Sequence, residues 1–378
     1  MSVRLEKRKV RILRIIGECK TGGTEVIALN YYRHLDHNQF AMDFLFYGKS
    51  LPRFTEELEQ HGDKVFNVIE YSKGLIRSIR EIRRIVKAGK YDIVHSQLNT
   101  LNVFPLLGAW LGGSKIRIAA NHSTANLRYE TKKSIIKYCL RPTVCLFATN
   151  LCACSKEAAI WGFGKRKFNK VKIIPNAIEL TNFKYSDETR KLIRSKEKWE
   201  GKFVVGHIGR FTEQKNHRYI IKIFDEIVKK CPNGLLVFIG EGELIEPIRE
   251  QVMKLKLEEK VRFLGIRFDI SSLMQGMDVF LFPSLYEGLG NVIIEAQGVS
   301  LKSFVSDRVP REVKLTEFVN FLSLEDAPEK WADEIVSYLI GYQRTDTHPE
   351  LMKANYDIET AVKGLEDYYL SLLTSRAM

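Results

Sequence analysis

Residues 278–299 have the sequence DVFLFPSLYEGLGNVIIEAQGV. Residues 278–282 predict a buried strand, residues 283–290 a tight loop and residues 291–299 a helix. In a parallel sheet, Glu287 would then lie at the carboxyl edge of a strand and Glu295 in the first turns of the next helix, where such sheets bind ligands. Carboxylates accept hydrogen bonds from hydroxyls, and the free amides of a helix start attract anions, so a ligand with hydroxyls and phosphate would suit both. Taken alone, a surface Glu in a loop and a first-turn Glu stabilised by the helix dipole are the better explanation for most such pairs.

The same alternation of strand and helix extends through the chain. Parallel, doubly wound α/β sheets are expected from it. The predicted strands are 10–17, 42–47, 64–68, 92–96, 117–121, 151–154 and 171–174, then 203–208, 235–239, 261–264, 278–282, 304–306 and 319–322.

A chain of 378 residues is too long for one ordinary core, so two domains are expected. Residues 177–200 lose the periodicity and gain charge, which is typical of a linker. We therefore expect an N-terminal domain at 1–176, a linker at 177–200 and a C-terminal domain at 201–355. A last helix at 356–378 could cross back to the first domain.

The formal net charge of +13 is unevenly distributed. Residues 1–175 hold 31 Lys or Arg against 14 Asp or Glu, whereas the remainder holds 28 against 32. This asymmetry favours contact of the first half with an anionic membrane surface, nucleic acid or a diphosphate-bearing substrate. Nucleic acid is the weakest of these, because no nucleic-acid-binding motif is present. Two basic helices, predicted at 75–87 and 131–146, could lie on anionic lipid, or could simply pack on their own sheet.

The cysteines and the N-terminus indicate a reducing compartment. Cys19, Cys139, Cys145, Cys152, Cys154 and Cys231 show no paired CxxC spacing and predict buried, reduced thiols. The first residues carry charges throughout, without the apolar core of a signal peptide, and no run approaches the ~18 apolar residues of a membrane span. We expect a cytoplasmic protein, with peripheral membrane contact left open.

Further candidate residues lie at other predicted strand ends. Gly22 and Gly23, in CKTGGTE, would let the backbone approach a phosphate or sugar, or would form an ordinary tight turn. His95 and His122 could each donate to an oxygen or transfer a proton, or could be satisfied capping residues. A second motif, GRFTEQKNH at 209–217, places Arg210 and Lys215 beside a helix start, where they would form a diphosphate clamp unless they are solvated and idle.

The GGTE turn, His122, Pro175-Asn176, the GR...KN loop and EGLGNVIIE follow the order and spacing of retaining glycosyltransferase family 4. The chain resembles this family over nearly its whole length, and it is most similar to the bacterial capsular and exopolysaccharide enzymes. The resemblance implies the GT-B fold: two Rossmann-like, doubly wound parallel-sheet domains facing a central cleft. It also implies that the N-terminal domain binds the acceptor and the C-terminal domain a nucleotide sugar.

The resemblance implies roles for these residues. Glu295 would hold the ribose hydroxyls, Glu287 the hydroxyls of the donor sugar, and Arg210 and Lys215 the diphosphate. Further contacts would come from the amides of Gly290, Asn291 and Val292, from Gly22 and Gly23 of the other domain, and from His122 facing the transferred sugar. Gly290, Ser300 and Lys302 differ from the residues common in relatives. These differences affect the expected shape of the donor loop more than the expected reaction. No D-x-D is present, so we expect no metal and no cofactor besides the nucleotide sugar.

The resemblance implies a hexosyltransferase that moves a hexose or N-acetylhexosamine from a UDP-sugar to a glycan or lipid-diphosphate-linked acceptor at the inner face of the membrane, and the basic first half fits such an acceptor. Retention of configuration is implied by the resemblance. Two alternatives stay open: a UDP-sugar epimerase on the same fold, which would release no UDP, and a non-catalytic nucleotide-sugar-binding subunit of a polysaccharide assembly complex.

Overall fold

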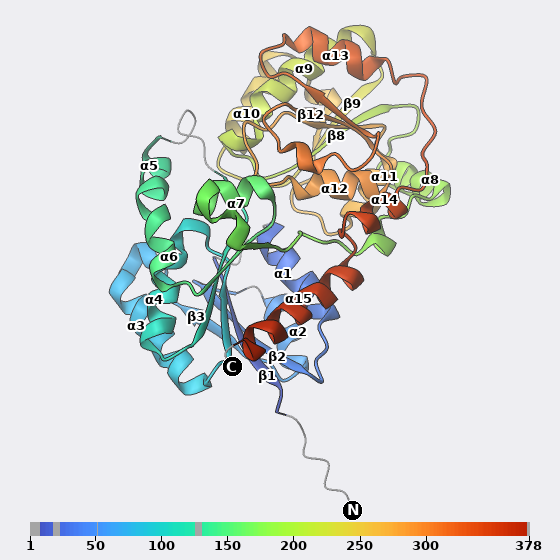
Figure 1. Cartoon of the computed structure of the whole chain (residues 1–378). Coiled ribbons are helices and arrows are strands. Elements are labelled where there is room, and N and C mark those ends of the chain that lie inside the picture. The colour runs from blue at the N-terminus through green and yellow to red at the C-terminus, as the bar shows by residue number, and fades with distance from the viewer. Residues whose placement is uncertain (1–7, 18–22, 51, 125–130, 376–378) are drawn as a thin grey trace, which may run out of the picture. The chain divides into compact units, whose positions relative to one another are not determined.

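A computed structural model describes residues 8–17, 23–50, 52–124 and 131–375. The chain divides into two compact units, Met1–Ala177 with Ile358–Met378, and Ile178–Asp357. Each unit is an α/β structure around one parallel sheet (Figure 1).

The first unit contains a seven-stranded sheet in the order β3-β2-β1-β4-β5-β6-β7. Its strands are β1 (Val10–Ile16), β2 (Phe40–Tyr47), β3 (Val65–Val68), β4 (Ile93–Ser96), β5 (Ile116–Asn121), β6 (Asn150–Ala153) and β7 (Val171–Ile173). Its α-helices are α1 (Gly23–His34), α2 (Pro52–Gln60), α3 (Tyr71–Gly89), α4 (Val103–Leu111), α5 (Thr131–Leu140), α6 (Val144–Phe147), α7 (Lys156–Phe163) and α15 (Ile358–Thr374).

Alternate side chains of β1 face opposite sides of this sheet, as the two-residue period of a strand requires. Ile12 and Ile16 pack into a core closed by α1 and α15. Leu13 and Ile15 pack into a second core, closed mainly by α3, α4 and α6. The last helix of the chain therefore covers one face of the first sheet.

The second unit contains a six-stranded sheet in the order β10-β9-β8-β11-β12-β13. Its strands are β8 (Phe203–Ile208), β9 (Gly234–Ile239), β10 (Val261–Phe263), β11 (Val279–Phe282), β12 (Lys302–Ser306) and β13 (Val319–Leu322). Its α-helices are α8 (Asp187–Lys196), α9 (His217–Lys230), α10 (Ile245–Lys254), α11 (Ile270–Gly276), α12 (Asn291–Gly298), α13 (Pro328–Val336) and α14 (His348–Lys353). All pairs of neighbouring strands in both sheets are parallel.

Each predicted strand is present, with ends that differ by at most two residues. Residues 177–200, expected as a linker, instead include a 3₁₀ turn at Leu180–Phe183 and the whole of α8, which packs on α11. The single helix expected at 131–146 is divided into α5 and α6 by a 3₁₀ turn, Arg141–Thr143, because Pro142 cannot continue the helical hydrogen bonds.

The cysteines differ in part from their predicted burial. Cys152, Cys154 and Cys231 are buried, whereas Cys145 is half-buried and Cys139 is exposed on α5, which corrects the prediction for that residue. Cys19 lies outside the described residues. Within the residues described, no helix is both long and apolar enough to cross a membrane.

Candidate active site

Two loops of the second unit, far apart in sequence, are joined by hydrogen bonds. They follow the neighbouring strands β8 and β11, so both start at the same edge of the sheet. The Leu285 amide donates to the Gln214 carbonyl at 2.8 Å, and the Gln214 side chain donates to the Tyr286 carbonyl at 2.9 Å. Asn216 Nδ2 donates to the Pro283 carbonyl at 3.2 Å. The loop containing Arg210 and Lys215 is thus fixed against the loop containing Glu287.

An ion pair crosses between the two loops. Lys215 Nζ lies 2.6 Å from Glu287 Oε1, and it also lies 4.6 Å from the centre of the Phe282 ring. The Glu287 residue is 8% exposed, so this pair is largely shielded from water and is stronger than a surface pair. The pair presents a cationic donor group beside a carboxylate acceptor, which suits a ligand with both phosphate and hydroxyl groups.

The helix after this loop begins at a glycine that its backbone requires. Gly290 has φ 98°, in the left-handed region, and directly precedes α12. Asn291 and Val292 form the first turn, where backbone amides lack intrahelical acceptors. This arrangement offers amide donors at the same edge of the sheet as Glu287.

Glu295 lies one turn into α12 and is half-buried. Burial raises the pKa of its carboxyl to about 7. Its carboxylate makes no hydrogen bond or ion pair with other described residues, so it is available as an acceptor. Arg210, by contrast, is exposed on its loop.

Two buried histidines that the sequence did not single out lie beneath this site. His207 Nδ1 donates to the Leu281 carbonyl at 2.8 Å, and His217 stacks on Phe211 with ring centroids 4.0 Å apart. Burial lowers the pKa of His207 to about 3 and that of His217 to about 2, so both are neutral. Their positions, one inside the apolar strand FVVGHI and one at a helix start, gave only a weak signal of burial.

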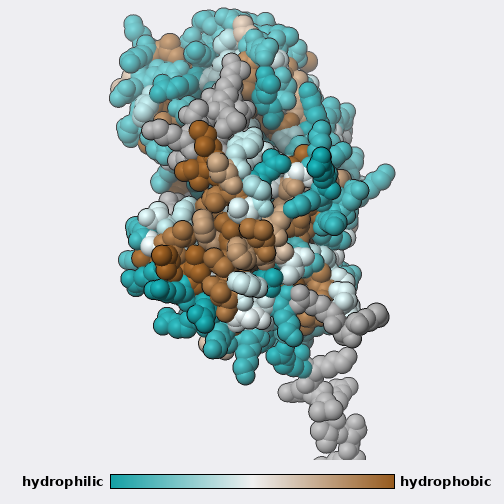
Figure 2. All heavy atoms as spheres, turned by 60° about the vertical axis from the view of Figure 1, so that its left-hand side comes forward, coloured by the Kyte–Doolittle hydropathy of each residue, from teal (hydrophilic) through white to brown (hydrophobic). Residues whose placement is uncertain are grey.

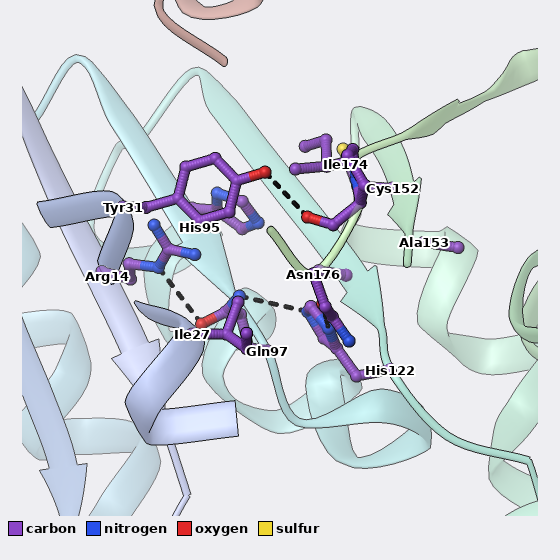
Figure 3. A pocket seen from close by; sticks show the side chains of 12 residues that line it. Arg14, Ile27, Tyr31, His95, Gln97, His122, Cys152, Ala153, Ile174 and Asn176 are labelled. Carbon is purple, nitrogen blue, oxygen red and sulfur yellow. Dashed lines mark hydrogen bonds between the residues drawn. The ribbon is translucent and has the colours of Figure 1, made fainter. Parts of the chain in front are cut away.

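The first unit brings four polar residues into one chain of hydrogen bonds (Figure 3). Arg14 Nε donates to Gln97 Oε1 at 3.1 Å, Gln97 Nε2 lies 3.1 Å from His122 Nε2, and His122 Nδ1 lies 3.2 Å from Asn176 Oδ1. Because Arg14 only donates, the Gln97 amide must donate to His122 Nε2, which leaves the ring proton on Nδ1 for Asn176. The chain therefore fixes both the orientation and the tautomer of His122.

The pKa of His122 is lowered to about 4 by burial and by the nearby Arg14. Its ring is therefore neutral at pH 7, with both nitrogens engaged. His95 is buried next to this chain, with Nδ1 2.8 Å from the Tyr369 hydroxyl of α15. Arg14 and Gln97 were not predicted as site residues. The signal for Arg14 is a second arginine, after Arg11, in the otherwise apolar strand VRILRII.

Of the two glycines predicted to border the donor, only one lies within the described residues. Gly23 is the first residue of α1, and Gly22 lies outside the described residues. No group of His, Cys, Asp or Glu able to hold a metal ion occurs in the part of the chain that the structure describes.

Comparison with known families identifies both units. Residues 21–182 match the family described as Glycosyltransferase Family 4, and residues 189–347 match Glycosyl transferases group 1. The chain is a glycosyltransferase of this family 4 and group 1 type.

Relatives are consistent with this assignment. EpsF of Bacillus subtilis, which is named as a glycosyltransferase, is 29% identical over 95% of this chain and 96% of its own length. The Escherichia coli UDP-Gal:alpha-D-GlcNAc-diphosphoundecaprenol alpha-1,3-galactosyltransferase is 27% identical over 61% of this chain and 62% of its own. Anabaena HepE, solved with UDP-glucose, superposes with a TM-score of 0.79 at 20% identity, over 96% of this glycosyltransferase and 99% of HepE. The fold is GT-B, as predicted.

Proposed function

We propose that this glycosyltransferase transfers a hexose or N-acetylhexosamine from a UDP-sugar to a glycan or lipid-diphosphate-linked acceptor in bacterial surface polysaccharide synthesis. The transfer retains the anomeric configuration and requires no divalent metal. The observation that carries the proposal is the Lys215–Glu287 ion pair, fixed between two loops at the edge of the sheet that also carries Glu295.

Each part of the donor has a matching group in the second unit. Glu295 accepts from the ribose hydroxyls, and Glu287 accepts from hydroxyls of the transferred sugar. Lys215 and Arg210 bind the diphosphate together with the amides of Gly290, Asn291 and Val292. These groups stabilise the negative charge of the departing nucleotide diphosphate.

In this proposal the acceptor hydroxyl attacks the anomeric carbon from the face that the diphosphate leaves. A bond forms between the acceptor oxygen and that carbon, the bond to the diphosphate oxygen breaks, and the hydroxyl proton passes to the departing diphosphate. His122 is neutral, with both nitrogens engaged, and therefore contributes by its fixed position and not by proton transfer.

The names of relatives support the donor and acceptor classes. HepE was solved with UDP-glucose, and the E. coli relative is named for UDP-Gal and an undecaprenol-diphosphate-linked acceptor. CapM of Staphylococcus aureus, named as a capsular polysaccharide biosynthesis glycosyltransferase, is 27% identical over 65% of this chain and 68% of its own.

The first unit also has a surface suited to an anionic membrane. Figure 2 shows apolar side chains gathered on the side of this unit where α3 to α6 lie. This apolar surface comprises Trp110 and Leu111 of α4, Ile135 and Ile136 of α5, and Leu146 of α6, all of which are exposed. α3, which packs on α4, exposes Arg77, Arg80, Arg83 and Arg84. We propose that this surface lies on anionic lipid at the inner face of the membrane, where a lipid-linked acceptor would be reached.

The first test is thermal unfolding with UDP-, GDP- and ADP-sugars in the presence of a metal chelator. A ligand at about 100 times its Kd stabilises the protein by about 2.7 kcal/mol, so one UDP-sugar should raise the Tm. UDP release should then depend on a lipid-linked acceptor. Turnover of the sugar nucleotide without UDP release would favour the epimerase, and binding without turnover would favour the non-catalytic subunit. Activity that is lost with chelator and restored by magnesium would contradict metal independence.

A further inference from the structure

Arg14 is a buried cation in the middle of the first sheet. It lies on β1 and is 1% exposed. Nε is satisfied by Gln97, but Nη1 has no hydrogen-bond partner among the described residues. No described Asp or Glu forms an ion pair with it. A buried guanidinium without a counter-charge is costly, because water no longer solvates it.

A second unsatisfied group lies beside it. His95 is the register neighbour of Arg14 on β4 and is also 1% exposed. Its Nδ1 is taken by the Tyr369 hydroxyl at 2.8 Å, while Nε2 has no partner in the part of the chain described. When the hydroxyl donates to Nδ1, the ring proton is on Nε2, and the imidazole then presents an N–H donor.

Both side chains line one small pocket beneath α1, shown in Figure 3. Apolar residues form much of its wall, among them Ile27, Ala120 and Ile174, and no acidic residue lines it among those described. The free space inside is about 10 Å³, close to the volume that one water molecule needs. A phosphate or a sugar carboxylate is several times larger than a water molecule, whereas a monatomic anion is only slightly larger than one.

We propose that this pocket binds a chloride-sized inorganic anion, held by Arg14 Nη1 and His95 Nε2. The anion compensates the buried guanidinium and so keeps Arg14 in place to donate to Gln97. Gln97 in turn sets the tautomer of His122. The consequence for His122 rests on the proposed function, but the binding of the anion does not.

The pocket is tested by thermal unfolding of the full chain in sodium chloride and in sodium gluconate at equal ionic strength, with no sugar nucleotide present. Chloride at about ten times its Kd should raise the Tm by about 2 °C relative to gluconate, which is too large to enter. Arg14→Met should abolish the difference between the two salts. Arg84→Met, which removes an exposed cation of α3, should keep it. Equal Tm values in the two salts for the unaltered protein, or a chloride effect that survives in Arg14→Met, would overturn the proposal.

A second measurement does not depend on the folding of any variant. Crystals of the unaltered protein grown in sodium bromide should show an anomalous peak within about 3.5 Å of Arg14 Nη1 and His95 Nε2. Density there without an anomalous signal would mean that water fills the pocket, and would refute the proposal. Because neither measurement uses turnover, a failed anion site is distinguishable from a failed glycosyltransferase assignment.

Discussion

At the residue scale, Lys215 and Glu287 pair with each other, so the two charges keep each other in position. The ion pair lies at 2.6 Å and is largely buried. Lys215→Ala removes the cation paired with Glu287 and leaves a largely buried carboxylate without this counter-charge, which is costly. The same change removes a charge from the proposed diphosphate clamp.

We therefore expect Lys215→Ala to lower kcat by about 100-fold or more, the scale observed when one preorganised charge stabiliser is lost. Steady-state UDP release measures it. Lys222→Ala, an exposed lysine of α9, is the matched control and should retain normal turnover. A normal rate in Lys215→Ala would remove this residue from the mechanism.

Glu295 predicts how donor binding depends on pH. Its pKa is raised to about 7, and only the ionised form accepts two hydroxyl hydrogen bonds well. Between pH 8 and pH 6 the affinity for a UDP-sugar should fall about tenfold, because protonation removes the binding form. Calorimetric titration measures this, and a UDP-sugar suits it since its diphosphate has no proton to lose in this range. Glu295→Gln should bind weakly with no such pH dependence; a variant that kept the same pH dependence would place the titrating group elsewhere.

At the scale of elements, α8 is tied to β11 by Asp278. Its carboxylate accepts from the Val204 amide at 2.7 Å and from Arg194 at 3.1 Å, and it also pairs with Arg190. These contacts explain why residues 187–196 belong to the second unit although their sequence has the charge of a linker. Arg190 and Arg194 of α8 both bind Asp278, which lies more than 80 residues further along the chain.

Asp278→Ala should lower the free energy of unfolding by about 3 kcal/mol, because it removes the counter-charge of two half-buried guanidinium groups and the acceptor of a backbone amide. Urea unfolding followed by tryptophan fluorescence measures the change. Asp333→Ala, which removes an exposed partner of Lys230, should change stability by less than about 1 kcal/mol. Equal effects of the two variants would show that Asp278 does not hold α8.

The apolar surface of α4, α5 and α6 gives a prediction for membrane binding. Trp110 is 52% exposed and Leu146 is 71% exposed, so their replacement should disturb little of the core. Trp110→Ser with Leu146→Ser should lower binding to vesicles containing anionic lipid by about tenfold or more, from the apolar area lost. Co-sedimentation measures it. Leu192→Ser, at an equally exposed leucine of α8 in the second unit, should bind normally. Unchanged binding by the double variant would exclude this surface.

At the scale of the whole molecule, buried neutral histidines make stability depend on pH. The pKa of His217 is about 2 in the folded protein, against the ordinary value of 6.5 that applies to the unfolded chain. As the pH falls below 6.5, the unfolded chain takes up a proton that the folded protein refuses, so stability is lost from there down towards the folded pKa. His95, His122 and His207, whose pKa values are also lowered, act in the same direction. Glu295 acts in the opposite direction, since its raised pKa favours protonation of the folded state.

A single variant separates His217 from these other groups. Between pH 7.5 and pH 5.5, the protonation of His217 in the unfolded chain should lower the free energy of unfolding by about 1 kcal/mol. His217→Phe should remove this contribution, because phenylalanine does not titrate. Denaturant unfolding of both proteins at the two pH values measures it. The variant should lose less stability on acidification than the unaltered protein, and an identical loss would show that His217 is not buried and neutral.

Much of the fold follows from local sequence. Each strand is an apolar run of the expected length, and the loops after 208 and 282 carry glycines and polar residues at a strand-to-helix junction. The motif containing Glu287 and Glu295 could be placed for the same reason, because residues eight apart across a strand end and a helix start have few alternative positions.

The sequence by itself thus determined two parallel sheets and the edge at which their polar residues lie. Tertiary structure alone decided which of those residues meet. The Lys215–Glu287 pair spans 72 residues and the Arg14–Gln97 bond spans 83, and such contacts depend on strand order and register, which no local pattern encodes. Burial is likewise a property of the packed whole. Burial lowers the pKa of His122, so that its ring is neutral, and raises the pKa of Glu295. It also lowers the pKa of Arg14. The reason is the same in each case: the cost of removing a charge from water depends on everything packed around it.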